Sequence, residues 1–143
     1  LGASWTFQGY VSAFNVTAET EEAIGFEATI RVSGEPSLNI GASTGLSGLS
    51  LTGTGGTLSP TFSNSVYYYT FGGVSAASVT VTATAANHSL KLYVDGVYSQ
   101  DLTSAQASSA ISLTTGVGKK LTIVAQESGK ASVAYEVIVV KTS

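Results

Sequence analysis

Residues 45–71, GLSGLSLTGTGGTLSPTFSNSVYYYTF, decide the fold of this chain. The stretch opens with leucines that alternate with small residues, and the glycines at 53–56 predict a tight turn. Pro60 cannot donate a ladder hydrogen bond, so it predicts a strand edge or a corner. We expect Leu58 and Phe62, on either side of Pro60, to turn inward and become buried.

An aromatic run at 66–71 follows this corner. Side chains alternate across a strand, so Tyr67, Tyr69 and Phe71 share one face and Tyr68 takes the other. The predicted structural corner comprises Leu58, Pro60, Phe62 and Tyr69.

Two segments carry a resemblance to a known family. Residues 56–62, GTLSPTF, resemble the G-x-L-x-P-x-F corner of the bacterial cadherin-like domain, and residues 135–139, YEVIV, resemble its closing strand. Tyr69 fits that family's tyrosine. The resemblance covers about residues 45–142 and implies an immunoglobulin-like β-sandwich.

The composition favours an all-β protein. The chain has 143 residues, of which only 10% are charged, and glycine and tyrosine are frequent. Its net charge is −3, and the six basic residues form no patch, which disfavours sequence-independent nucleic-acid binding by neutralisation of phosphates. We expect no specific nucleic-acid binding either. There is no cysteine, so disulfide frameworks, cysteine zinc sites and thiol catalysis are excluded. We expect no membrane association, because no apolar run has the length of a bilayer span.

The N-terminal segment, residues 1–40, predicts a hairpin. Residues 4–16 alternate as a strand whose pattern weakens near Gly9, and residues 24–33 alternate almost perfectly. An acidic turn with Glu19, Glu21 and Glu22 joins them. A lone hairpin is marginal in water, so this one needs a partner.

This segment resembles the C-terminal hairpin of a phage major tail (tail tube) protein. The matching residues are Trp5, Phe7, Gly9-Tyr10-Val11 and Phe14, with Val32-Ser33-Gly34-Glu35-Pro36 at the end. The resemblance implies a hairpin from a second, incomplete domain and self-assembly into hexameric rings. It also implies an immunoglobulin-like domain that projects from the tube and weakly contacts the bacterial surface.

A linker is expected at 41–48 and the sandwich at 45–143. Asp95-Gly96 lies between alternating segments and predicts a two-residue hairpin turn. Further strands are predicted at 78–85, 89–95, 97–99, 110–114, 120–127 and 131–141.

The residues with catalytic potential are few. His88 is the only histidine and follows Asn87 in a predicted turn, where we expect it to be solvated. Glu127 and Glu136 could be imagined as a glycosidase pair, but both positions look like exposed strand ends. We therefore predict no enzyme, no catalytic residue, no cofactor and no metal site.

Aromatic side chains supply the remaining candidate site. Tyr67, Tyr68, Tyr93 and Tyr98 could form a surface for sugars, because tyrosine combines an apolar ring with a polar tip. They could equally be core residues or cross-strand pairs.

Two functions from different classes follow. The first is a structural virion protein, the C-terminal part of a phage tail tube protein that assembles with copies of itself. The alternative is an immunoglobulin-like adhesion or glycan-binding module of a bacterial cell-surface or secreted protein.

Overall fold

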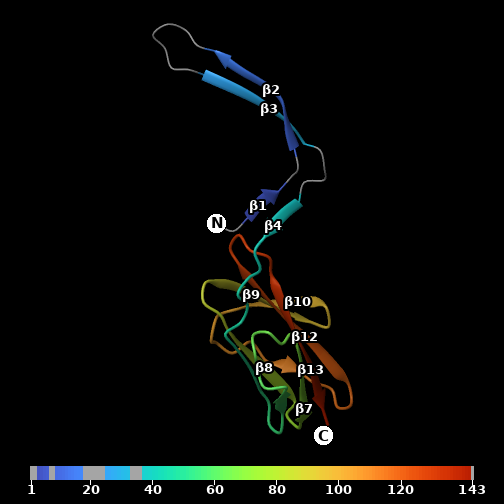
Figure 1. The fold of residues 1–143 in the computed structure, drawn as a ribbon. Coiled ribbons are helices and arrows are strands. Elements are labelled where there is room, and N and C mark those ends of the chain that lie inside the picture. Colours follow the sequence, from blue (N-terminus) through green and yellow to red (C-terminus); the bar gives the residue numbers. More distant parts are fainter. Residues whose placement is uncertain (1–2, 7–8, 18–24, 33–36, 143) are drawn as a thin grey trace. The chain divides into compact units, whose positions relative to one another are not determined.

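The computed structural model describes residues 3–6, 9–17, 25–32 and 37–142 (Figure 1). The backbone divides into two compact units, Leu1–Ile40 and Gly41–Ser143. All regular elements in the described residues are β-strands, which confirms the predicted all-β fold class.

The first unit contains two separate strand pairs. Strand β1 (Ala3–Thr6) pairs antiparallel with β4 (Ser37–Ile40), and β2 (Gly9–Thr17) pairs antiparallel with β3 (Gly25–Val32). The β2–β3 pair confirms the predicted hairpin. The single strand expected at 4–16 is instead divided into β1 and β2. The predicted acidic turn lies outside the described residues.

A β-bulge in the hairpin sets which side chains share a face. The register shifts between Val11 and Ala13, so Val11 pairs with Ile30 and Phe14 pairs with Ala28. The extra residue, Ser12, keeps these four side chains on one face despite the uneven spacing in β2. Val11 is 58% exposed and Ile30 is 55% exposed. The hairpin therefore presents an apolar face.

The second unit contains a three-stranded and a six-stranded sheet. The smaller sheet has the order β11-β8-β5, and the larger has the order β10-β9-β12-β13-β7-β6. The smaller sheet comprises β5 (Gly48–Thr52), β8 (Ser78–Thr84) and β11 (Ile111–Ser112). The larger comprises β6 (Thr57–Ser59), β7 (Tyr68–Val74), β9 (His88–Val94), β10 (Val97–Leu102), β12 (Gly118–Glu127) and β13 (Val133–Lys141).

Buried side chains from both sheets form one core between the two layers. The smaller sheet contributes Val79, Val81 and Ala83, which alternate along β8 as the sequence predicts. The larger sheet contributes residues from its four central strands: Leu92, Leu121, Ile123, Tyr135, Val137, Val139, Tyr69 and Phe71. Burial of this apolar surface is the main term that favours folding.

One pair of neighbouring strands is parallel. Strand β13 pairs antiparallel with β12 on one side and parallel with β7 on the other. The pair β9–β10 is the hairpin that Asp95-Gly96 predicts. Both turn residues have positive φ, 50° at Asp95 and 83° at Gly96, as a type I′ turn requires.

The predicted corner forms, but two of its side chains are less buried than expected. Tyr69 is 3% exposed, whereas Leu58 and Phe62 are only partly buried against the core. The reason is that β6 is the edge strand of its sheet, so this flank is covered on one side only. The Phe62 ring stacks on Tyr69, with centroids 6.0 Å apart. The peptide bond between Ser59 and Pro60 is cis.

Residues 41–48, expected as a linker, pack within the second unit. Leu46 is 1% exposed and belongs to the core. The Ser43 N–H donates to Ala131 O at 2.9 Å, and the Ala131 N–H donates to Gly41 O at 2.9 Å. The residues of this stretch are mostly small, and their backbone groups form hydrogen bonds within the second unit. They show no alternation of apolar and polar side chains, so the sequence did not predict this packing.

Candidate functional site

Three of the four candidate tyrosines lie in one row across the outer face of the six-stranded sheet. The register pairs Tyr98 with Tyr93, and Tyr93 with Thr122. It also pairs Thr122 with Glu136, and Glu136 with Tyr68. Residues in register on neighbouring strands point to the same side of a sheet. We call these five residues the tyrosine row.

The two ends of the row differ in their aromatic contacts. Tyr93 and Tyr98 meet edge to face, with ring centroids 5.8 Å apart, and Lys91 Nζ lies 5.8 Å from the Tyr98 centroid. Tyr68 occupies the other end and is 72% exposed. An exposed ring at this position keeps an apolar surface in contact with water.

Tyr67 does not belong to this face. Its ring packs against Tyr135, with centroids 5.4 Å apart, and Tyr135 is fully buried in the core. Tyr67 therefore lies on the core side of the sheet rim, as the alternation with Tyr68 requires. Of the four candidate tyrosines, the tyrosine row contains Tyr68, Tyr93 and Tyr98.

A hollow of about 270 Å³ lies next to Tyr68, where β6 ends. Its walls carry both apolar and polar groups, and an ion pair lies alongside. Lys120 Nζ is 2.6 Å from Glu136 Oε1. The residues that line the hollow are Ser59, Pro60, Tyr68, Tyr69, Thr70, Glu136 and Ile138.

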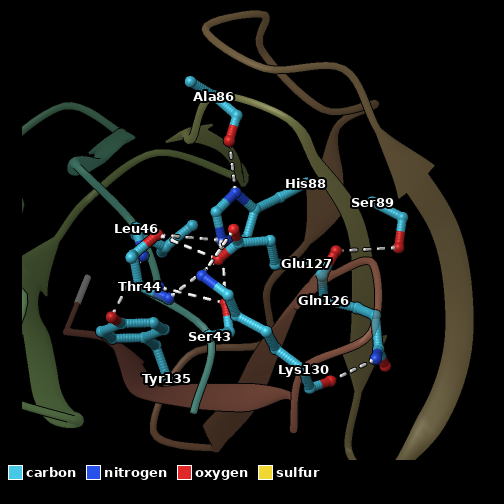
Figure 2. Close-up of polar contacts among 11 residues, drawn as sticks. Ser43, Thr44, Leu46, Ala86, His88, Ser89, Gln126, Glu127, Lys130 and Tyr135 are labelled. Atoms are coloured by element: carbon cyan, nitrogen blue, oxygen red, sulfur yellow. Dashed lines mark hydrogen bonds and ion pairs between the residues drawn. The ribbon is translucent and has the colours of Figure 1, made fainter. Parts of the chain in front are cut away.

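A second group of polar residues surrounds His88 (Figure 2). The His88 side chain is only 2% exposed, so the expectation of a solvated turn residue is wrong. Its Nδ1 lies 2.5 Å from Ala86 O, and its Nε2 lies 2.8 Å from Ser43 Oγ. The ring contacts Ser43 and Thr44, more than 40 positions earlier in the chain, and the alternation around His88 contains no signal of that contact.

Glu127 joins the same group of polar residues. Its Oε1 is 2.7 Å from Lys130 Nζ, and its Oε2 accepts the Thr44 N–H at 3.3 Å. The hydrogen bond from Lys130 lowers the pKa of Glu127 below its ordinary value of 4.5, and this effect outweighs the opposing effect of burial. The ionised carboxylate thus links Thr44 to the end of β12.

A hydrogen-bonded serine and histidine can also begin a nucleophilic triad. That chemistry requires a serine that is open to substrate, whereas Ser43 is 7% exposed. Ser43 Oγ also accepts the Gly45 N–H at 3.2 Å. No residue that lines the hollow beside Tyr68 belongs to this group. These contacts hold residues 43–46 in place.

The described part of the chain contains no cluster of three or more His, Asp or Glu side chains that could hold a metal ion. Within the same residues, no helix is long and apolar enough to cross a membrane. Comparison with protein-family models, with curated proteins and with solved structures gives no match for this chain.

Sequence reasoning missed the polar neighbours of Tyr68. Glu136 comes from β13, and Thr122 and Lys120 come from β12, all more than 50 positions along the chain from Tyr68. Alternation indicates that each faces outward, but only the strand order places Glu136 next to Tyr68, with Thr122 and Lys120 on the following strand.

Proposed function

We propose that this chain is a structural assembly module, the C-terminal part of a phage tail tube protein. In this proposal, the β2–β3 hairpin is the arm through which copies of the chain join. Residues 41–143 form a domain that projects from the tube, and the assembly belongs to the virion. The observation that carries the proposal is the exposed apolar face of the hairpin.

The exposed apolar face favours binding of the hairpin to a partner. Val11 and Ile30 face each other across the ribbon and are both more than half exposed. A two-stranded ribbon is marginal in water by itself, and covering its apolar face would stabilise it.

A second copy of the chain is the occupant that this face favours. Within the described residues, β2 and β3 pair only with each other, so each also offers an outer backbone edge. Strand edges pair readily with edges of other chains. Copies that exchange such contacts around an axis would form a ring, and the family resemblance implies six of them.

The second unit supports an immunoglobulin-like assignment in this proposal. It has two packed β-layers, and the Tyr69 hydroxyl lies 2.7 Å from Ser63 O and 2.8 Å from Val66 O. A tyrosine that bonds back to the backbone a few residues upstream is typical of immunoglobulin-like sandwiches. The cadherin-like assignment stays part of the proposal.

The test is the oligomeric state of the full chain. We expect sedimentation velocity to show assemblies that grow with concentration, and negative-stain electron microscopy to show rings or tubes. The double variant Val11→Asp with Ile30→Asp places charges on the apolar face and should remain monomeric.

Thr29→Asp is the matched control, because Thr29 pairs with Ala13 on the opposite face of the ribbon. It should assemble like the parent. A parent that stays monomeric at high concentration, or a control that loses assembly as fully as the double variant, would refute the proposed arm.

The second candidate function is an adhesion or glycan-binding module at a bacterial surface. The tyrosine row favours it, because tyrosine rings lie on both sides of hydrogen-bonding groups on one face. This function predicts a saccharide complex whether or not the chain assembles. In neither proposal is the chain an enzyme.

A further inference from the structure

The hollow beside Tyr68 combines three features that seldom serve folding alone. Tyr68 is 72% exposed and Ile138 is 38% exposed, so apolar surface meets water around it. The Thr70 hydroxyl lies on the same wall and donates to Ser59 O at 3.3 Å. Glu136 also lines the hollow, and its carboxylate is paired with Lys120 outside the lining.

The outer face of the six-stranded sheet, where the hollow lies, carries balanced charge. Among the described residues, its charged side chains are the pair Lys120 and Glu136 together with Lys91 and Asp101, which are in register. Two positive and two negative charges sum to zero. Such a face gives little attraction to nucleic acids or anionic membranes, which need a positive surface. An uncharged ligand fits it best.

We infer that the hollow binds an N-acetylated hexosamine unit of an uncharged glycan. The inference rests on the second candidate function, glycan binding at a bacterial surface, and is independent of the hairpin arm. The hollow's volume of about 270 Å³ falls just below the roughly 300–1,000 Å³ of sites that enclose drug-sized ligands. It therefore suits one sugar unit rather than a whole oligosaccharide.

The chemistry of an acetamido sugar matches the groups present. A pyranose ring has a face of C–H groups, which can stack on the exposed Tyr68 ring. The acetamido methyl is apolar and can contact Pro60 and Ile138. Glu136 can accept the amide N–H while its Oε1 stays with Lys120, because a carboxylate accepts several hydrogen bonds.

The rest of the tyrosine row can receive further sugar units. Tyr93 is three strand positions from Tyr68, roughly 14 Å at about 4.8 Å per strand. Thr122 and Glu136 lie between the two rings. A linear glycan laid across the strands would meet hydroxyl and carboxylate groups and then a second aromatic surface.

A proline-rich peptide is the main competing ligand. Such peptides dock in grooves lined by several aromatic side chains. At the hollow, Tyr68 is the one exposed ring among the lining residues, because Tyr69 is buried in the core. The hollow therefore favours a sugar.

The experiment is an NMR titration of the ¹⁵N-labelled full chain with tetra-N-acetylchitotetraose. Cellotetraose is the matched probe, since it has the same linkage but no acetamido groups. We expect the acetylated probe to shift the amides of Thr70, Glu136 and Ile138. We expect cellotetraose to bind at least fivefold more weakly.

Two variants locate the site. Tyr68→Ala should weaken binding of the acetylated probe at least tenfold, and Tyr68→Phe should retain it within about twofold because the ring remains. Tyr67→Leu is the matched control, since Tyr67 is adjacent in sequence but packs on the core side. It should leave the affinity unchanged.

The outcomes distinguish the specific assignment, an acetamido sugar in the hollow, from the general one, glycan binding. Equal affinity for both probes at the same amides overturns the acetamido assignment and leaves a glycan-binding role. No binding of either probe, or binding that Tyr68→Ala leaves intact, overturns both. Tighter binding of a proline-rich decapeptide at these amides would assign the hollow to a peptide instead.

Discussion

Gly45 lies against the Tyr135 hydroxyl. Its φ is 74°, and a Cβ at this position would overlap Tyr135 Oη. That hydroxyl accepts the Leu46 N–H at 3.1 Å and donates to Asn64 O at 3.0 Å. It cannot move aside without breaking bonds that join two distant parts of the core.

Gly45→Ala should therefore destabilise the second unit by about 3 kcal/mol, since left-handed strain and a clash add together. Gly116→Ala is the matched control. Gly116 has a φ of 73° but no heavy atom within 4 Å of an added Cβ. It should cost only about 1 kcal/mol. Urea denaturation followed by circular dichroism measures both, and equal losses would show that Tyr135 yields to the added methyl.

Glu127 should make the fold more stable at neutral than at acidic pH. Its pKa is lowered in the folded chain, first by the Lys130 hydrogen bond, so the unfolded chain binds the proton more readily. The stabilisation is fully present above its ordinary pKa of 4.5 and is lost as the pH falls through the lower folded value.

Glu127→Gln removes the titrating group, so its Tm should fall less than the parent's between about pH 7 and pH 3. Lys130→Ala removes the main cause of the shift and should act in the same direction. Thermal unfolding at both pH values tests this, and an unchanged Tm difference in both variants would contradict it.

At the scale of elements, the corner between β6 and β7 depends on stacked aromatic rings. Phe62 lies 6.0 Å from Tyr69 and 6.2 Å from Tyr135, centroid to centroid. It is partly buried, so Phe62→Ala should cost about 2 kcal/mol rather than the roughly 3–5 kcal/mol of a fully buried phenylalanine. Thr61→Ala, at an exposed neighbour, should cost less than about 0.5 kcal/mol. Equal costs in chemical denaturation would mean that the stack adds nothing.

Strands with long alternating patterns could be predicted, whereas β4 could not. The alternation of Val79, Val81 and Ala83 in β8, and the turn Asp95-Gly96, are local signals that the fold retains. The four residues of β4 are too few to show a period, so they gave no strand signal.

The candidate site was predictable only in part, for a physical reason. Alternation assigns Tyr68 and Tyr93 to a face of their own strands. The distance between them depends on the order of β7, β13, β12 and β9, which is set by contacts far apart in sequence. The burial of His88 has the same origin, since Ser43 lies 45 positions away.

At the scale of the whole molecule, the two units should differ in autonomy. All buried apolar residues of the core cluster lie within 41–143, whereas the first unit consists of two-stranded pairs. We expect residues 41–143 to fold alone and residues 1–40 not to. Amide dispersion in NMR spectra of the two fragments measures this. A collapsed spectrum for 41–143 would mean that its stability depends on the first unit.

Residues 41–43 run parallel to the segment that leads into β13, and this arrangement has a mechanical consequence. Ala42 bridges Ala131 in parallel, and β13 then runs to Lys141. Tension applied between Gly41 and Lys141 therefore acts along β13, so its lateral hydrogen bonds are loaded together in shear. Tension between the paired residues Gly118 and Val140 would instead peel β12 from β13 one pair at a time. Single-molecule pulling should give a clearly higher rupture force in the first geometry, and equal forces in both would contradict the shear argument.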